Sequence, residues 1–292
     1  MESSNKCDKT LKGGLRTIGF GNCTNSTIPL ITVITVVFNN ASQLEKTIKS
    51  VLSQSYVNIE YIIIDGGSND GTFGILQKYS EKIDFWISEP DKGIYDAMNK
   101  GIEKATGSWI NFMNSDDEFY SKDSIGEIFY DHICDSIEII YGDVVASDNV
   151  TSQDLMIKAK PIKQLWKEMC FSHQSCFIRK ETLMKYMFNL KYSIAADYFL
   201  LLNLYKNKAA FFYHSGPIAK IAIHGVSYSK PQTAVEIKKA YSEVYHDLLG
   251  NAYHTFAVIT AFIRIFVKSL LGNNLTNQIR AKKWFFMQTR VL

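Results

Sequence analysis

The sequence has 292 residues, of which 46% are hydrophobic and 21% are charged. This length and composition are typical of one large globular domain, or of one domain with an appendage, and they exclude disordered, collagen-like, coiled-coil and repeat architectures. The net charge of +3 is too small to indicate a protein that binds nucleic acid.

Strands and helices are predicted to alternate in the first part of the chain. Residues 1–28 are polar and without periodicity, so they predict an irregular lead-in. Ser42 and Glu45 have the spacing of a capping box at the first helix. The alternation, with strands that are almost continuously apolar, predicts an α/β protein with a mostly parallel central sheet flanked by helices. The predicted strands are 30–38, 59–64, 84–88, 109–113 and 137–145, and the predicted helices are 43–54, 72–80, 94–105 and 122–134.

The pattern is less regular after about residue 150. From residue 231 onward every segment predicts helix, so we expect a helical C-terminal extension over residues 231–292. Between these parts, helices are predicted at 161–169, 180–188 and 197–205, and strands at 174–179, 209–213 and 217–223.

The cysteines and the start of the chain favour a cytoplasmic protein. The five cysteines are an odd number and include no CxxC pair, which argues against a disulfide framework and against a zinc site. The first residues lack the apolar segment of a secretory signal. No uncharged apolar run of about 18 residues occurs, so the sequence predicts no membrane-spanning helix.

Two acidic loops follow predicted strands. Asp65 ends one strand and precedes glycines, so its carboxylate either accepts hydrogen bonds from a nucleobase or ribose or caps a tight turn. Asp116 and Asp117 follow another strand. Adjacent carboxylates repel one another unless a cation neutralises them, and their oxygens suit Mg²⁺ or Mn²⁺; the alternative is a solvated turn. Ligands of open α/β sheets bind at the carboxyl ends of the strands, where both loops are expected.

Three further segments contain candidate residues. A helix that begins after Lys92 would present its backbone N–H groups and that lysine to an anion, unless the stretch is an ordinary loop. Asp197 opens an apolar helix, where a carboxylate either stabilises the helix N-terminus or serves as a general base. His173, with Gln174, precedes a predicted strand, and His224 follows one. Each histidine is either a ligand or a structural residue.

Four segments, in this order, resemble the motifs of one enzyme family: TVVFNNASQLEKTIKSVLSQSY, IEYIIIDGGSNDGT, WISEPDKGIYDAMNKGI and GSWINFMNSDDEFY. They resemble the family 2 glycosyltransferases, which are nucleotide-sugar-dependent enzymes with the GT-A fold. The similarity is closest to the small bacterial members that build exopolysaccharide, capsule and O-antigen. It is specific across residues 29–130 and looser across residues 160–230, where SHQSCFIRKE, AADYFLLL and HGVS are similar to the family's acceptor half.

The resemblance implies roles for the matching residues. Asp197 matches the family's general base. Asn114 stands where many relatives have the first aspartate of the metal-binding motif, which leaves one strong metal ligand there. The implied nucleotide-sugar-binding residues are Asp65, Gly66, Asp91, Lys92, Asn99, Asp116 and Asp117. The implied residues of the acceptor and donor-sugar pocket are His173, Gln174 and His224, and the implied ligands of Mn²⁺ or Mg²⁺ are Asp116 and His224.

The implied reaction is a metal-dependent sugar transfer with inversion at the anomeric carbon. The donor is a nucleoside-diphosphate sugar, commonly a UDP-sugar, and the acceptor is a saccharide or lipid-linked saccharide in cell-surface polysaccharide synthesis. Residues 29–130 would form the nucleotide-sugar half and residues 131–230 the acceptor half. One alternative is a non-catalytic nucleotide- or sugar-binding protein with the GT-A fold, which Asn114 favours. A nucleotidyltransferase is disfavoured, because the loop after the first strand has no basic residue.

The C-terminal residues 253–290 combine an apolar segment with Arg, Lys, Trp and Phe residues. Such a helix can lie in a membrane interface, where its basic residues favour anionic lipid. The alternatives are a helix packed on the domain and a homodimer interface. The membrane interpretation predicts a peripheral protein on the inner face of the cytoplasmic membrane.

Overall fold

The computed structural model describes residues 10–20, 27–148, 153–222 and 231–263. A single ten-stranded sheet runs through them in the order β1-β4-β3-β2-β5-β9-β7-β10-β6, with β8 paired to β7. The strands are β1 (Leu11–Gly13), β2 (Ile31–Val37), β3 (Ile59–Asp65), β4 (Phe85–Ser88), β5 (Trp109–Phe112), β6 (Glu118–Phe119), β7 (Ile139–Asp148), β8 (Gln153–Ile157), β9 (Cys176–Arg179) and β10 (Phe211–Ala222).

Strands β4, β3, β2 and β5 are parallel neighbours, as the sequence predicts. Their register pairs Val37 with Asp65 and Asp65 with Ser88, so the carboxyl ends of these strands meet at one edge. Beyond β5 the sheet is mixed. Strand β9 is antiparallel to both β5 and β7, whereas β7 and β10 are parallel. The predicted α/β class is confirmed, and the purely parallel part is confined to the first half of the chain.

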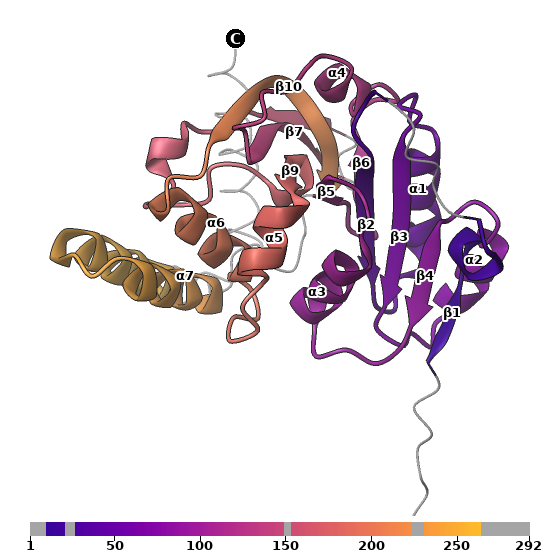
Figure 1. Ribbon diagram of the computed structural model, residues 1–292. Helices are drawn as coiled ribbons and strands as arrows, with labels where there is room; N and C mark the ends of the chain where they lie inside the picture. The colour runs from indigo at the N-terminus through magenta and orange to yellow at the C-terminus, as the bar shows by residue number, and fades with distance from the viewer. Residues whose placement is uncertain (1–9, 21–26, 149–152, 223–230, 264–292) are drawn as a thin grey trace, which may run out of the picture.

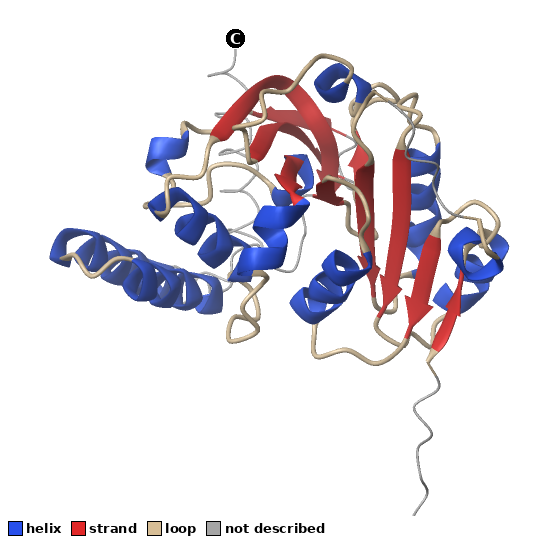
Figure 2. Cartoon of the chain, in the orientation of Figure 1, coloured by secondary structure: helices blue, strands red, loops and turns tan. Residues whose placement is uncertain are grey.

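Helices cover both faces of the sheet (Figures 1 and 2). On one face, α1 and α2 pack against the sheet in one hydrophobic core. On the other face, α3, α5, α6 and α7 share the second core. The helices are α1 (Ala41–Leu52), α2 (Thr72–Lys78), α3 (Ile94–Lys104), α4 (Gly126–Phe129), α5 (Lys180–Tyr186), α6 (Ala196–Lys206) and α7 (Pro231–Val244), with short 3₁₀ turns η1 (Leu15–Ile18), η2 (Ile162–Gln164) and η3 (His173–Ser175).

The apolar patterns explain why these elements form. Every residue of β2 is buried, as expected for a strand that is covered on both faces. In α1, Leu44, Ile48 and Val51 recur at helical spacing and are buried against the sheet. Full burial of one such side chain contributes about 1.5–3 kcal/mol to folding, so Ile48, with none of its surface exposed, is a principal anchor of this helix.

The predicted capping box at α1 is wrong. The helix begins at Ala41, and its N-cap residue makes no side-chain cap hydrogen bond. A carboxylate from the neighbouring loop takes this place, because Asp70 Oδ2 accepts a hydrogen bond from the Ala41 N–H at 2.9 Å. Glu45 instead pairs with Lys49 at 2.9 Å and accepts from Tyr79 at 2.8 Å. A long-range contact therefore overrides the local signal.

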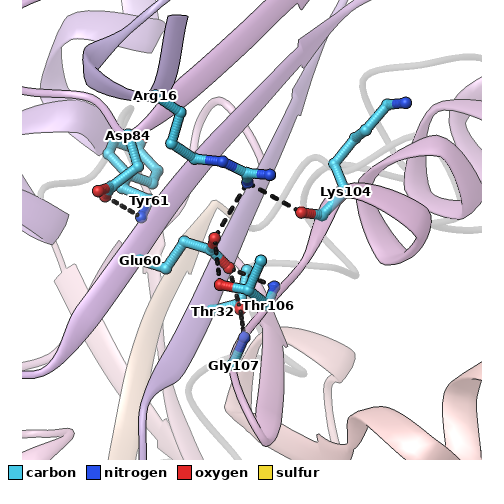
Figure 3. Close-up of polar contacts among 8 residues, drawn as sticks. All are labelled: Arg16, Thr32, Glu60, Tyr61, Asp84, Lys104, Thr106 and Gly107. Atoms are coloured by element: carbon cyan, nitrogen blue, oxygen red, sulfur yellow. Dashed lines mark hydrogen bonds and ion pairs between the residues drawn. The ribbon is translucent and has the colours of Figure 1, made fainter. Parts of the chain in front are cut away.

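The predicted irregular lead-in contains regular structure. Strand β1 pairs antiparallel with β4, and η1 follows it. Arg16 in η1 donates to Glu60 at 3.0 Å, and this fully buried carboxylate also accepts from Thr32 Oγ1 at 2.6 Å and from the Thr106 N–H at 2.7 Å (Figure 3). A buried charge needs such partners, and the lead-in supplies the cationic one.

Three other predicted elements differ from the structure. Residues 122–134 form only the short α4 within turns, and residues 161–169 form only η2 and turns. The two strands predicted at 209–213 and 217–223 are the single strand β10, whose pairing with β7 shifts register around Pro217. A proline lacks an N–H donor, and the irregular register at this point accommodates it.

The described chain from residue 231 is helical except at residues 245–247. It forms α7 and a second helical segment, residues 248–263. Within the described ranges, no helix has the length and apolarity needed to cross a membrane. The rest of the segment 253–290, from residue 264, lies outside the described residues, and so does His224.

Candidate active site

The polar loops after β2, β3 and β5 are joined at the carboxyl edge of the parallel strands. The Asn39 N–H donates to Ser68 Oγ at 2.7 Å, which links the loop after β2 to the loop after β3. Asn40 Nδ2 donates to Ser115 Oγ at 3.1 Å, which links the first loop to the loop after β5. The acidic residues predicted from these loops therefore belong to one edge of the molecule.

Asp65 is fully buried at the end of β3. Its Oδ1 accepts from the Ser68 hydroxyl at 2.5 Å, and its Oδ2 accepts from the Ser88 hydroxyl at 2.5 Å. The Ser68 N–H adds a third donor. These hydrogen bonds fix the orientation of the carboxylate.

Gly66 and Asp91 are in direct contact. A Cβ atom on Gly66 would lie 2.5 Å from Asp91 Oδ2, so only glycine leaves room for this carboxylate. Asp91 Oδ1 accepts from the Gly93 N–H at 2.8 Å. Burial raises the pKa of Asp91, and the Asp96 and Asp65 charges add to this effect, although the Gly93 hydrogen bond and the Lys100 charge oppose it. Two buried or half-buried carboxylates thus lie close together beside the first loops.

Lys92 and Asn99 lie on either side of the start of α3 and have different surroundings. Lys92 is exposed, and its backbone N–H donates to Asp96 Oδ2 at 3.0 Å. Asn99 uses both ends of its amide, because it donates to the Phe188 carbonyl and accepts from the Phe188 N–H, each at 2.9 Å. Asn99 therefore links α3 to the chain after α5, whereas the Lys92 side chain is open to solvent.

Asp117 is 3% exposed and accepts from Gln174 Nε2 at 2.6 Å. Burial and the adjacent Asp116 charge raise the pKa of Asp117 to about 7, although the Gln174 hydrogen bond opposes the shift. Asp116 itself is half-buried. Asp117 is therefore a poorly stabilised carboxylate at neutral pH, and a cation placed beside the pair would favour its charged form.

A line of polar side chains connects the loop after β5 to α6 and α3. Asn114 Nδ2 lies 2.9 Å from His173 Nε2, and His173 Nδ1 lies 3.6 Å from Asp197 Oδ2. The Tyr95 hydroxyl lies 3.1 Å from Asp197 Oδ1. An amide that donates to Nε2 places the ring proton on Nδ1, which faces the carboxylate. The structure thus brings together His173 and Asp197, which are far apart in the sequence.

No lysine or arginine of the described chain forms an ion pair with Asp65, Asp91, Asp116 or Asp117. Within the same residues no three acidic, histidine or cysteine side chains converge as a metal site. Proteins usually hold Mg²⁺ through one or two carboxylates completed by substrate phosphates and water. The half-buried Asp116 carboxylate, beside Asp117, fits a cation that is bound in this way.

Sequence reasoning missed three residues that hold this site together. Ser68 and Ser88 orient Asp65, and Tyr95 contacts Asp197. All three lie inside the segments that resemble the family's motifs, so their positions carried a signal. Their partners Asp65 and Asp197 were predicted as well, but the pairing of Ser88 with Asp65 and of Tyr95 with Asp197 joins residues from different elements, and local spacing does not predict it.

The fold is that of the GT-A glycosyltransferases. It resembles a mannosyltransferase from Pyrobaculum calidifontis solved with GDP-Man and Mn²⁺, with a TM-score of 0.61 and 14% identity over 88% of this chain and 80% of that one. It also resembles S. aureus TarS residues 1–349 solved with UDP-GlcNAc, with a TM-score of 0.57 and 15% identity over 74% of this chain and 66% of that one.

The sequence defines the family. Residues 32–187, more than half of the chain, match the family described as Glycosyl transferase family 2. The chain belongs to this family, as its motifs predict.

Curated relatives match over different shares of their length. An uncharacterized glycosyltransferase of Mycobacterium tuberculosis is 43% identical over 100 residues, which are 34% of this chain and 38% of the relative. A Bacillus subtilis glycosyltransferase named for teichuronic acid biosynthesis, TuaG, is 44% identical over 101 residues, which are 33% of this chain and 39% of TuaG. A PGL/p-HBAD biosynthesis glycosyltransferase of Mycobacterium bovis is 27% identical over 190 residues, covering 62% of this chain and 72% of the relative. The chain thus spans about two fifths of the first two relatives.

Proposed function

We propose that this protein transfers a sugar from a nucleoside-diphosphate sugar, a UDP-sugar, to a hydroxyl of a saccharide or lipid-linked saccharide. The observation that carries the proposal is the gathering of Asp65, Asp91, Asp116 and Asp117 at one sheet edge with Asp197 connected to it through His173. The names of the relatives support a role in cell-surface polysaccharide or glycolipid synthesis.

The donor nucleotide would bind at the loops after β2 and β3, within residues 29–130. Asp65, which two serine hydroxyls orient, and Asp91 are acceptors for the N–H and O–H groups of a base and ribose. Gly66 allows the backbone to approach the nucleotide closely. Lys92, with its exposed side chain, is placed before the N-terminus of α3 and would contact the diphosphate.

The diphosphate would leave at the Asp116–Asp117 loop. A bound Mn²⁺ or Mg²⁺ supplies positive charge for the leaving group. Asp116 would hold it, together with His224, and Asp117 would support the site from its buried position against Gln174. The raised pKa of Asp117 supports this assignment. It reflects the cost of holding two adjacent negative carboxylates without a cation, and a bound metal ion would remove that cost.

Asp197 would act as the general base, at the boundary with the acceptor half, residues 131–230. Its Oδ1 is engaged by the Tyr95 hydroxyl and by the Tyr198 N–H at 2.8 Å. Its Oδ2 faces His173 at 3.6 Å, which leaves this oxygen more available to take the proton of the acceptor hydroxyl. A single displacement inverts the anomeric configuration, and His173 and Gln174 would shape the pocket.

The helical extension, residues 231–292, would place the protein at the inner face of the cytoplasmic membrane. Residues 248–263 contain no charged side chain, and several large apolar residues of this helical segment are exposed: Leu248, Leu249, Tyr253, Phe256, Ile259, Phe262 and Ile263. Basic residues follow in the sequence. Flotation with vesicles of anionic phospholipid, compared with vesicles of phosphatidylcholine, tests this attachment, and a monodisperse dimer that binds neither contradicts it.

The donor assay is a panel of nucleotide sugars with and without Mn²⁺ or Mg²⁺. It measures thermal stabilisation and released nucleoside diphosphate. We expect one class of nucleotide sugar to stabilise the protein and to be turned over. Both effects should depend on the metal and should be lost in Asp116→Ala. A folded wild-type protein that no nucleotide sugar stabilises contradicts the proposal.

The second candidate is a nucleotide- or sugar-binding protein without turnover. Asn114 favours it, because an amide stands where many relatives have the first carboxylate of the metal-binding motif. Stabilisation by a nucleotide sugar with no release of nucleoside diphosphate, in the presence of saccharide acceptors, would support this candidate.

A further inference from the structure

The loop before α6, residues 193–195, is held by a carboxylate from α7. Glu236 Oε1 accepts from the Ser193 hydroxyl at 2.6 Å and from the Ser193 N–H at 3.2 Å. Glu236 Oε2 accepts from the Ile194 N–H at 2.8 Å and from the Ala195 N–H at 3.0 Å. Three successive backbone donors and one hydroxyl therefore converge on a single side chain.

These donors precede a helix that cannot cap itself. The N-cap residue of α6 is Ala195, which has no polar side chain and makes no side-chain cap hydrogen bond. The N–H groups at a helix start need acceptors, and a negative charge there is favourable. Burial raises the pKa of Glu236, but the hydrogen bonds from Ser193, Ile194 and Ala195 outweigh it, so its pKa is lowered and the carboxylate is charged at neutral pH.

Tyr95 holds the same loop from the opposite direction. Its hydroxyl lies 2.7 Å from the Ile194 carbonyl oxygen as well as 3.1 Å from Asp197 Oδ1. Burial and the Asp197 charge raise the pKa of Tyr95, so the hydroxyl keeps its proton and remains a donor. The backbone at Ile194 is thus fixed at its N–H by Glu236 and at its carbonyl by Tyr95.

Glu236 lies far along the chain from the family match, which ends at residue 187. Helix α7 packs beside α6 in the second core (Figure 1). Asp197 lies in the first turn of α6, two positions after the last residue that Glu236 contacts. Because α6 begins directly after this loop, the position of the loop helps to set the position of the Asp197 carboxylate.

We propose that Glu236 is a positioning residue for Asp197, and that α7 is a working part of the active site rather than an appendage. The proposal rests on the role of Asp197 as the general base. Glu236 fixes the backbone that carries Asp197, so its loss should lower the rate of the chemical step and leave donor binding intact, since the nucleotide loops lie on other elements.

The test compares Glu236→Gln and Glu236→Ala with Glu243→Gln. Glu243 is the other acidic residue of α7 and pairs at the surface with Lys191 at 3.0 Å. Hydrogen exchange of residues 193–195 and steady-state turnover of the nucleotide sugar are measured on all full-length variants. Loss of exchange protection in both Glu236 variants is expected, with kcat about 10- to 100-fold lower and the donor KM within about twofold of wild type. Glu236→Gln should be the milder change, because one acceptor oxygen remains, and Glu243→Gln should resemble wild type.

Unchanged exchange, an unchanged kcat, or an equal loss in Glu243→Gln would overturn the proposal. If Glu236→Ala does not fold, Glu236→Gln decides, because it preserves the size of the side chain. A wild-type protein that turns over no nucleotide sugar would instead refute the proposed function. The exchange measurement then decides alone whether Glu236 holds the loop.

Discussion

The two edges of the parallel strands treat buried carboxylates in opposite ways. At the amino edge, Glu60 has an arginine partner, a threonine hydroxyl and a backbone N–H, all supplied by the protein (Figure 3). At the carboxyl edge, Asp91 and Asp117 have raised pKa values and no lysine or arginine in ion-pair contact within the described ranges. The first edge pairs its buried charge within the protein, whereas the carboxylates at the second edge have no ion-paired cation in the described chain, as is common at functional sites.

The largest expected effect at the carboxyl edge concerns catalysis. Asp197→Asn removes the proposed general base while preserving the size of the side chain, so kcat should fall about 10²- to 10⁴-fold. The unfolding midpoint in urea should change little, because the Asn carbonyl still accepts from the Tyr198 N–H. Initial rates at saturating donor measure the effect. Retention of more than half of the wild-type rate would remove Asp197 from the proposed mechanism.

The reverse outcome is expected at the amino edge. Glu60→Gln removes the charge that Arg16 pairs with and replaces one acceptor oxygen by an NH₂ group, which should destabilise folding by about 1–3 kcal/mol. Donor turnover at a temperature where the variant is folded should equal that of wild type. Urea unfolding and turnover are measured together, with Asp65→Asn as the counterpart at the other edge. Asp65→Asn should lose donor affinity, and it should destabilise folding less than Glu60→Gln does, because it breaks no ion pair. The comparison between the edges would be wrong if Glu60→Gln mainly lowered donor affinity and Asp65→Asn mainly lowered stability.

The stability of the carboxyl edge should depend on pH through Asp117. Its pKa is about 7 in the folded protein and lower in the unfolded chain, so the folded state holds the proton longer. The contribution of Asp117 to stability is therefore present at about pH 4 and is lost as the pH rises to about 7. Urea unfolding from pH 4.5 to 7.5 should show this decrease in wild type, and Asp117→Asn should flatten it. A difference between the two proteins that grows toward acidic pH would contradict the assignment.

A smaller effect is expected from the contact between Gly66 and Asp91. Gly66→Ala would push a methyl group against the Asp91 carboxylate, which must then shift, so folding should be destabilised by about 1–3 kcal/mol. Nucleotide affinity should decrease, because the Asp91 carboxylate is displaced.

The matched control is Gly74→Ala. A Cβ atom there would meet no atom within 4 Å, and the position lies inside α2. Helix propensity predicts a stabilisation of about 0.5–1 kcal/mol with no change in affinity. Isothermal titration with the preferred nucleotide compares the two variants. Equal affinities would show that the fit between Gly66 and Asp91 does not affect binding.

The sequence predicts the parallel half of the fold well, because its signals are local. Strand β2 is continuously apolar, and the buried face of α1 repeats at helical spacing, so neither depends on distant residues. The prediction for residues 1–28 was wrong, because β1 is specified by its pairing with β4 and by the contact between Arg16 and Glu60. The predicted start of α1 was wrong for the same reason, since Asp70 replaces the local cap.

For the candidate site, the sequence identified residue types but not their assembly. Strand-end carboxylates such as Asp65 and Asp117 are visible as polar breaks after apolar runs. The link from Asn114 through His173 to Asp197 joins three separate segments. Glu236 contacts the loop before Asp197, residues 193–195, from a helix in which the sequence indicated no site residue. Spacing along the chain carries no information about such contacts.

The junction between β5 and β9 has a mechanical consequence. Backbone pairing there joins the strand that precedes Asn114 to the strand that follows Gln174, so both halves of the chain share one hydrogen-bonded plate. In a protein whose two domains close about a hinge, the interface between the domains is free to open. In this protein the two halves of the sheet separate only if the backbone hydrogen bonds between β5 and β9 break. The spacing between the two sides of the proposed site is therefore set by the sheet itself, and the loops at its edge are the parts that can move without breaking this pairing.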